Sequence, residues 1–190
     1  MRNNKITIGV SGDKGSFSEE AGNYYAKEEG IGNYGIKYLI DMEGVLKALD
    51  KKKIDIGIFP IVNSTGGVVE QAITAMGRYP FKLEKIFPIL IKHCLLAKIG
   101  SKRKNIKKIY SHSQAIKQCE RYLFKNYKKA DIIEYVDTAK AAKDLSSGKL
   151  SGDPAVIAPQ GCARLYDLEI LEKGIQDKKD NYTTFLAVKK

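Results

Sequence analysis

Short apolar segments alternate with helix-forming segments along most of this chain, and this alternation limits the possible folds more than any other feature. In the first third, strand-like and helix-like segments follow one another at residues 6–10, 18–29, 36–40, 42–52 and 54–59. Strands that alternate with helices in this way predict βαβ units, in which helices cover a parallel sheet. The sequence therefore predicts an α/β fold, with Pro60 ending the third strand.

The same alternation begins again after a long apolar stretch at residues 81–98, which can hold two strands. Further strands are predicted at residues 106–110, 132–135 and 155–158, and helices at 112–127, 138–147 and 160–166. The last strand-like segment, Tyr182–Val188, follows no helix of this second half, so we expect it to return to the first sheet. We therefore expect two lobes, the first formed by residues 1–82 with 175–190 and the second by residues 83–174.

The composition is that of an ordinary globular protein, with 43% hydrophobic and 29% charged residues among 190. We expect no membrane span, because no apolar run approaches about 18 residues. The first residues lead directly into a strand without the apolar segment of a signal peptide, so we expect a cytoplasmic protein. Cys94, Cys119 and Cys162 are far apart and match no zinc pattern, which predicts buried, reduced thiols.

Positive charge is concentrated in one part of the chain. The formal net charge is +11, and residues 98–129 alone carry nine Lys, two Arg and one Glu. This segment has three interpretations: a surface for nucleic acid, a solvated Lys-rich face, or a source of attraction for a small anionic substrate. No recognisable pattern of base-stacking aromatic residues is interleaved with the cations, which argues against nucleic acid.

Small polar residues fill three loops that follow predicted strands and precede predicted helices, at residues 11–18, 60–69 and 111–114. Ligands of open α/β sheets bind beyond the carboxyl ends of the strands. Helix N-termini offer unpaired N–H groups and a partial positive charge, which suit a carboxylate or a phosphate. The three loops together predict a polar site for an anion, although Ser and Asn also cap helices for purely structural reasons.

Five short motifs, in this order, resemble the catalytic region of the prephenate dehydratase family. They are Gly12-Asp-Lys-Gly15-Ser16-Phe17-Ser18, Pro60-Ile-Val62-Asn63-Ser64-Thr-Gly-Gly67-Val-Val69, Ser111-His112-Ser113-Gln114-Ala-Ile-Lys-Gln118-Cys119, Ala158-Pro-Gln-Gly-Cys-Ala-Arg-Leu-Tyr166 and Asn181-x-Thr183-x-Phe185. The resemblance runs nearly end to end. It implies a two-lobed fold like that of type II periplasmic binding proteins, with the active site in the interlobe cleft. It also implies a reaction in which prephenate loses water and carbon dioxide to give phenylpyruvate, without a metal or organic cofactor.

The resemblance also implies roles for individual residues. Thr183 matches the catalytic Thr of the family's Thr-Arg-Phe signature and would donate a hydrogen bond to the leaving hydroxyl. The implied substrate-binding residues are Ser16, Asn63, Ser64, Ser111, His112, Gln114, Asn181 and Phe185. For His112, a capping role and a catalytic role both remain open. Family members usually form oligomers, and we expect a dimer. They also usually continue into an ACT domain that binds phenylalanine, whereas these 190 residues resemble the catalytic region alone.

Two departures from the family pattern keep an alternative open. Thr184 stands where the signature has Arg, and Val62 stands where the family has Glu before the Asn-Ser pair. A charge-assisted hydrogen bond contributes about 1.5–3 kcal/mol, so the loss of the Arg would weaken binding or slow the reaction by roughly 10- to 150-fold. The alternative is a binding module of the same fold that recognises a small carboxylate, either without turnover or with altered specificity.

Overall fold

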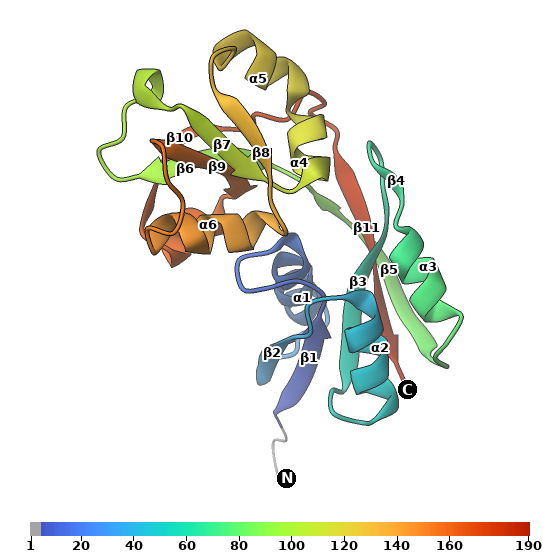
Figure 1. Ribbon diagram of the computed structural model, residues 1–190. Coiled ribbons are helices and arrows are strands. Elements are labelled where there is room, and N and C mark those ends of the chain that lie inside the picture. The colour runs from blue at the N-terminus through green and yellow to red at the C-terminus, as the bar shows by residue number, and fades with distance from the viewer. Residues whose placement is uncertain (1–4) are drawn as a thin grey trace. The chain divides into compact units, whose positions relative to one another are not determined.

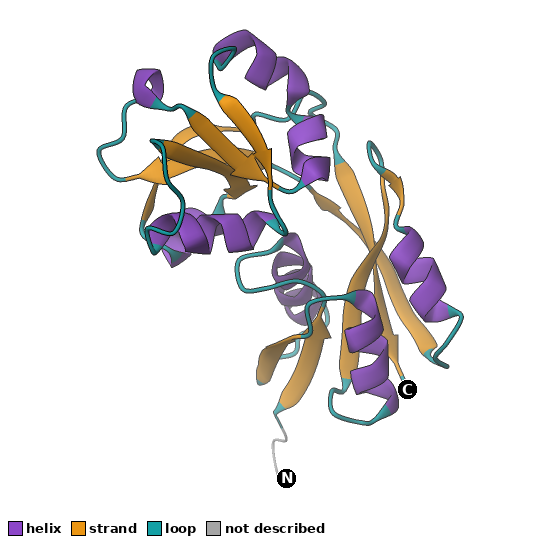
Figure 2. Cartoon of the chain, viewed as in Figure 1, coloured by secondary structure: helices purple, strands orange, loops and turns teal. Residues whose placement is uncertain are grey.

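The structure, a computed structural model, describes residues 5–190. The chain forms two compact units, each built on its own mixed sheet with helices on both faces (Figures 1 and 2). The first unit consists of the chain up to Leu90 together with Tyr182–Lys190. The second unit consists of Ile91–Asn181. The last strand therefore belongs to the first unit, as the alternation pattern predicted.

The first sheet mixes parallel and antiparallel pairs. Its strands are β1 (Ile6–Val10), β2 (Tyr34–Tyr38), β3 (Ile56–Asn63), β4 (Gly67–Val68), β5 (Lys82–Leu90) and β11 (Tyr182–Lys189). Their order is β2-β1-β3-β11-β5, and β4 pairs with β3. β1 is parallel to β2 and β3, whereas β11 runs antiparallel between β3 and β5.

Each face of the first sheet has its own helical cover. The helices are α1 (Phe17–Glu28), α2 (Met42–Asp50) and α3 (Glu70–Met76). On one face, tyrosines of α1 pack against Phe87, whose ring stacks on that of Phe185 with centroids 6.2 Å apart. On the other face, α2 and α3 enclose a cluster that includes Phe59 and Leu186. The two clusters are separate because the side chains of successive strand residues point to opposite faces of the sheet.

Pro60 does not end the third strand, contrary to our expectation. β3 continues to Asn63, and the register between β3 and β11 shifts between Thr184 and Phe185, next to Pro60. Proline has no N–H to give to a ladder, and a bulge is one of the few places where a sheet tolerates it. The chain then turns into a hairpin with β4, and α3 begins only at Glu70. The loop at residues 60–69 is therefore largely a hairpin and not a helix start lined by small polar side chains.

The second sheet repeats this plan. Its strands are β6 (His93–Lys98), β7 (Lys108–Ser111), β8 (Asp131–Glu134), β9 (Pro154–Pro159) and β10 (Leu168–Lys173), in the order β10-β6-β9-β7-β8. β7 is parallel to β8 and β9, while β6 runs antiparallel between β9 and β10. The helices are η1 (Arg103–Asn105), α4 (Ser113–Gln118), α5 (Glu120–Asn126), α6 (Thr138–Ser146) and α7 (Gly161–Leu165).

Two hydrophobic clusters cover the faces of the second sheet. Cys94 and Cys162 lie in the cluster under α6 and α7, and Cys119 lies in the cluster under α4 and α5. All three thiols are free and buried, as predicted. Burial raises the pKa of Cys94 and Cys119, so both remain protonated and unreactive at neutral pH.

The predicted helix at residues 112–127 is two helices, because the backbone leaves helical geometry at Cys119. Asp177 supplies the reason. Its carboxylate accepts the N–H of Arg121 at 2.9 Å and the N–H of Tyr122 at 3.2 Å. A carboxylate that takes these donors starts a new helix in place of a continuation of the old one.

The boundaries between the units differ from those expected at 82/83 and 174/175. Residues 83–90 stay with the first unit, because β5 pairs with β11 as far as Leu90. Residues 175–181 stay with the second unit, where the N–H of Ile175 donates to His93 O at 3.0 Å.

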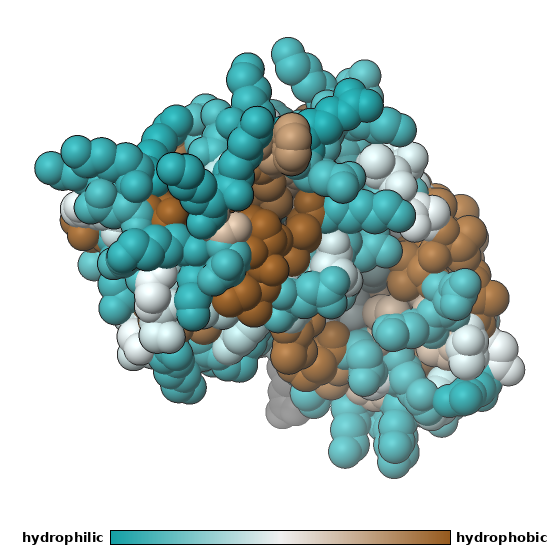
Figure 3. All heavy atoms as spheres, turned by 45° about the horizontal axis from the view of Figure 1, so that its top comes forward, coloured by the Kyte–Doolittle hydropathy of each residue, from teal (hydrophilic) through white to brown (hydrophobic). Residues whose placement is uncertain are grey.

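Hydrophilic side chains cover much of the surface drawn in Figure 3, with hydrophobic residues in patches between them. The most exposed hydrophobic residues include Val136, Phe124 and Ile40. Lys128 lies over the ring of Phe124, 4.7 Å from its centroid, so part of the basic segment is a solvated face with its own aromatic contact. In residues 5–190, no helix combines the length and apolarity that crossing a bilayer requires.

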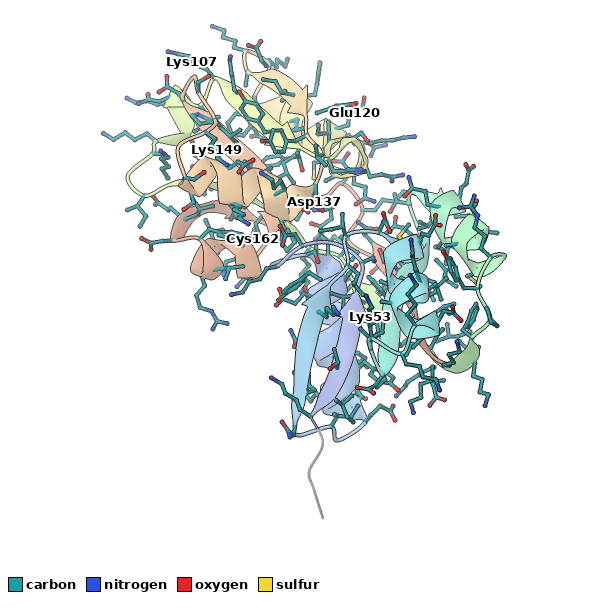
Figure 4. The ribbon with its side chains drawn as sticks, turned by 60° about the horizontal axis from the view of Figure 1, so that its bottom comes forward. Lys53, Lys107, Glu120, Asp137, Lys149 and Cys162 are labelled. Atoms are coloured by element: carbon teal, nitrogen blue, oxygen red, sulfur yellow. The ribbon has the colours of Figure 1, made fainter. Side chains whose placement is uncertain are left out.

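A buried carboxylate anchors α6 in the second unit. Tyr135 donates its hydroxyl to Asp144 Oδ2 at 2.6 Å, Lys140 forms an ion pair with the same carboxylate, and Lys149 Nζ lies 3.6 Å from Oδ1. Figure 4 labels Asp137, which caps the start of this helix, and Lys149 beyond its end. Burial alone would raise the pKa of Asp144, but the bonds from Lys140 and Tyr135 outweigh it and lower the pKa.

Replacing Asp144 with Asn should lower the free energy of unfolding by about 1.5–3 kcal/mol at pH 7, the range for hydrogen bonds to charged groups. The lowered pKa stabilises the folded state above the unfolded-state pKa of about 3.9, and this contribution is lost as the pH falls through the folded-state value. The difference in free energy of unfolding between wild type and Asp144→Asn should therefore disappear at acidic pH, as measured by urea unfolding at several pH values. Asp153, paired with Lys107 at 3.0 Å on the surface, is the control, and Asp153→Asn should cost less than about 1 kcal/mol.

Candidate functional site

Thr183 lies next to Asn63, one strand away in the first sheet. The two residues are paired in the register of β11 and β3, and Asn63 Nδ2 donates to Thr183 Oγ1 at 2.8 Å. The side chain of Thr183 is largely buried, with 8% of the residue exposed. The sheet thus joins the predicted catalytic hydroxyl to a predicted substrate-binding residue that is 120 positions away in sequence.

The orientation of the Asn63 amide follows from its other bonds. Its Oδ1 accepts the N–H groups of Thr65 at 2.9 Å and Gly66 at 2.7 Å, in the turn of the β3–β4 hairpin. The remaining atom, Nδ2, can only donate, so the Thr183 oxygen must accept. A hydroxyl that accepts through its oxygen keeps its own proton for donation to another group. Asn63 therefore prepares Thr183 as a hydrogen-bond donor.

Ser64 fastens the hairpin turn to the beginning of β11. Its N–H donates to Tyr182 O at 2.8 Å, and its Oγ accepts the N–H of Tyr182 at 2.9 Å. The side chain of Ser64 thus occupies the place of a backbone carbonyl in the ladder. This bond fixes the residue that precedes Thr183, so Ser64 supports the geometry of the hydroxyl.

The two positions at which this chain lacks a charged residue of the family pattern face each other. Thr184 pairs with Val62 in the β11–β3 register, and with Pro88 on its other side. Glu at position 62 and Arg at position 184 would form a cross-strand pair of opposite charges. In this chain the pair is uncharged. Because neighbouring strand residues point to opposite faces, the side chain at 184 points away from the hydroxyl of Thr183.

The structure gives two other predicted residues of the first unit structural roles. Ser16 caps α1, with its Oγ accepting the N–H of Glu19 at 3.3 Å. Phe185 is 1% exposed and packs in the core against Phe87. These contacts account for both side chains within the first unit, and their expected contact with substrate stays a prediction.

The motif at residues 111–114 follows β7 in the second unit. Ser111 is completely buried, and its hydroxyl donates to Ile157 O at 2.7 Å, which ties β7 to β9. His112 caps α4, because its Nδ1 accepts the N–H of Gln114 at 3.2 Å. The capping role of His112 is thus present, and the side chain of Gln114 is exposed on the first turn of the helix.

Asn181, a predicted substrate-binding residue, is hydrogen-bonded to a polar side chain that also contacts His93, which the sequence did not single out. It is 1% exposed, and its Nδ2 donates to Gln118 Oε1 at 2.8 Å. The same oxygen lies 2.8 Å from Nε2 of His93, the first residue of β6. Gln118 carried a signal, since it stands in the motif that contains Ser111. His93 carried none, because a single His in an apolar segment matches no pattern.

Within residues 5–190, no group of three or more His, Cys, Asp and Glu side chains could hold a metal ion. A shallow cavity of about 360 Å³ lies on the second unit, and none of the predicted site residues lines it. Its lining residues are Arg121, Tyr122, Lys125, Asn126 and Glu172–Asp177.

Comparisons with known proteins agree with the fold and with the motifs read from the sequence. The family model for prephenate dehydratase matches residues 8–190. "Arogenate dehydratase/prephenate dehydratase 2, chloroplastic" of Arabidopsis thaliana is 29% identical over 184 residues, which make up 97% of this chain and 46% of that protein. The chain spans about half the length of the curated relatives it matches.

Solved structures show the same fold. Prephenate dehydratase from Arthrobacter aurescens, solved in complex with L-Phe, gives a TM-score of 0.86 at 23% identity, covering 97% of this chain and 60% of that one. A putative methionine-binding lipoprotein from Bacillus subtilis gives a TM-score of 0.52 at 18% identity, covering 98% and 83%. A periplasmic substrate-binding protein of an ABC transporter from Coxiella burnetii gives a TM-score of 0.52 at 16% identity, covering 97% and 84%. The predicted α/β fold, like that of periplasmic binding proteins, is thus confirmed. Within this class, the chain belongs to the prephenate dehydratase family.

Proposed function

We propose that this chain catalyses the decarboxylative dehydration of prephenate to phenylpyruvate, a step in phenylalanine biosynthesis. The observation that carries the proposal is the hydrogen bond from Asn63 Nδ2 to Thr183 Oγ1, which leaves the threonine proton to be donated. The reaction needs such a donor, because the ring hydroxyl of prephenate is a poor leaving group unless its oxygen is hydrogen-bonded as it departs.

The conversion of prephenate to phenylpyruvate, carbon dioxide and water balances when one proton is taken up. The bond between the ring and its carboxylate breaks and releases carbon dioxide, and its electron pair enters the ring. The C–O bond to the ring hydroxyl breaks, and the hydroxyl leaves with its electron pair and becomes water by taking a proton. Thr183 would stabilise the charge that develops on the departing oxygen, and the net proton comes from solvent. No electron acceptor or donor is required.

The missing signature Arg weighs less against catalysis than the sequence suggested. Thr184 and Val62 are cross-strand partners, so the two charges of the family pattern are absent together. The position at 184 also lies on the opposite face of β11 from Thr183. Its substitution therefore alters a strand pair and leaves the donor arrangement of Asn63 and Thr183 in place.

A turnover assay decides between catalysis and binding. Purified chain should convert prephenate to phenylpyruvate with release of one carbon dioxide for each product molecule. Arogenate, which appears in the printed name of the Arabidopsis relative, is the second substrate to assay, with phenylalanine as its product. Tight binding of phenylpyruvate without turnover of either substrate would contradict the enzyme and support the binding module of the same fold.

Further properties belong to the same proposal. We propose a homodimer, to be checked by light scattering, and a cytoplasmic location, which three free buried thiols support. We assign the basic segment at residues 98–129 to attraction of the anionic substrate and not to nucleic acid. Raising the salt concentration should then increase KM for prephenate, and the protein should elute early from heparin.

A further inference from the structure

The cavity of about 360 Å³ on the second unit lies between α5 and the chain that leaves β10. Its volume is near the lower end of the range for small-molecule sites, about 300–1,000 Å³. All of its lining residues belong to the second unit, and none of them is a predicted substrate-binding residue. The cavity is therefore a surface to which no role has yet been assigned.

Three cations line the cavity and have no acidic partner. Arg121 and Lys125 lie one helical turn apart on α5, so their side chains project from the same side of the helix. Lys173 is the last residue of β10. Within residues 5–190, none of these three side chains forms an ion pair. Their charges are therefore available to a ligand.

The two carboxylates of the lining residues already have partners. Glu172 is paired with Arg103, which lies outside the lining, at 2.5 Å. Asp177 accepts the N–H groups of Arg121 and Tyr122, so these donors are not open to a ligand. With Glu172 balanced by Arg103, three positive charges remain beside the single negative charge of Asp177. The excess of two positive charges suits a ligand with two negative charges.

A neutral donor is buried at the same cavity. Gln176 lines it with only 9% of the residue exposed, and its Oε1 accepts the N–H of His93 at 3.0 Å. An atom that accepts a backbone N–H must be the oxygen, so Nε2 remains to donate. Nε2 has no hydrogen-bond partner in the described chain and is not sealed from solvent. A largely buried donor without a partner is costly, which favours a ligand that accepts from it.

We propose that this cavity is a binding site for a small dianion. Nε2 of Gln176 donates a hydrogen bond to one anionic oxygen, and the three cations balance the charge. Phosphate groups and dicarboxylates share this chemistry. Arg121 and Lys125 belong to the basic segment at residues 98–129, so two of its cations have a local ligand besides their part in general attraction. The site can bind a dianion whether or not the chain turns over prephenate.

Isothermal titration calorimetry with inorganic phosphate and with succinate tests the site, at an ionic strength fixed with sodium chloride. We expect one molecule to bind per chain. Binding of phosphate alone would identify a phosphate site, and binding of succinate alone a dicarboxylate site. If neither ligand binds saturably at millimolar concentrations, the proposal is wrong.

Two triple variants separate a local site from diffuse attraction. The first, Arg121→Gln/Lys125→Gln/Lys173→Gln, should raise Kd about tenfold or more, the value of at least one hydrogen bond to a charged group. The second removes the same charge from residues that do not line the cavity and should stay close to the wild-type Kd, because salt screens charges that do not touch the ligand. It consists of Lys104→Gln/Lys128→Gln/Lys129→Gln. An equal rise of Kd in both would overturn the proposal.

Gln176→Glu tests the buried donor. The introduced carboxylate keeps one oxygen for the N–H of His93 and places a second, negatively charged oxygen where Nε2 was. We expect Kd to rise at least tenfold, and to rise less in Gln176→Met, which is neutral. Circular dichroism and thermal unfolding establish that each variant is folded. Wild-type affinity in a folded Gln176→Glu protein would remove Gln176 from the site and contradict the proposal.

NMR of the wild-type chain adds a measurement that needs no variant. The side-chain NH₂ resonances of Gln176 should shift on titration with phosphate or succinate and saturate with the calorimetric Kd. Resonances that stay unchanged at saturating ligand would show that the anion binds elsewhere. That result would overturn the proposal even if Gln176→Glu does not fold.

Discussion

Replacing Thr183 with Val is expected to lower kcat for prephenate by about 100- to 10,000-fold, the usual contribution of a positioned proton donor. Valine keeps the branched shape that the strand favours and removes only the hydroxyl. Thr183 is largely buried beside Asn63, so the substitution also leaves the Asn63 amide short of one acceptor. We expect that loss to cost about 1–3 kcal/mol of stability, which is too little to unfold the unit.

Single-turnover kinetics should place the loss in the chemical step, with KM changed little. Thr183→Ser is the matched variant, because it retains a hydroxyl and should keep most of the activity. A Thr183→Val protein that is folded by circular dichroism and turns over prephenate at the wild-type rate would remove Thr183 from the mechanism and leave its hydroxyl a structural group of the sheet.

Replacing Asn63 with Asp should reduce kcat for prephenate almost as much as Thr183→Val does, although it exchanges only an NH₂ group for an oxygen. The carboxylate keeps Oδ1 as acceptor for the N–H groups of Thr65 and Gly66, so the hairpin turn persists. Its second oxygen can only accept, so it will accept a hydrogen bond from the Thr183 hydroxyl. The hydroxyl then points its hydrogen at the introduced carboxylate and has none for the leaving group.

Asn63→Ala gives the opposite test of the same bond. It removes the turn contacts and should lower stability, yet it frees the Thr183 hydroxyl to rotate and donate. We therefore expect Asn63→Ala to be the less stable variant and Asn63→Asp to be the less active one. If Asn63→Asp is the more active of the two, the direction of the hydrogen bond plays no part in catalysis.

The sequence predicted features that are set by local periodicity and by short motifs. The βα alternation located most strands, and α2 begins where Asp41 accepts the N–H of Gly44 at 2.6 Å. The continuation of β3 past Pro60 could not be predicted, because it depends on an irregular pairing with β11, at the far end of the chain. Local sequence holds no information about that partner.

The candidate site shows the same limit. Thr183, Asn63 and Ser64 were predicted from motifs, and the structure pairs the first two on adjacent strands and bonds Ser64, in the turn after β3, to Tyr182. The motif could not give the direction of the bond between Asn63 and Thr183, which depends on the two backbone N–H groups held by Asn63 Oδ1. The hydrogen bonds of His93 were equally hidden, because they join it to residues 25 and 83 positions away in sequence.

The pairing of Val62 with Thr184 couples what the two positions can tolerate. With Glu at one position and Arg at the other, a single substitution would leave the remaining charge without its cross-strand partner. Two uncharged residues leave no such unpaired charge, so a double replacement disturbs this strand pair less than a single one. The residues at 62 and 184 can therefore vary as a unit while the hydrogen bond between Asn63 and Thr183 is kept.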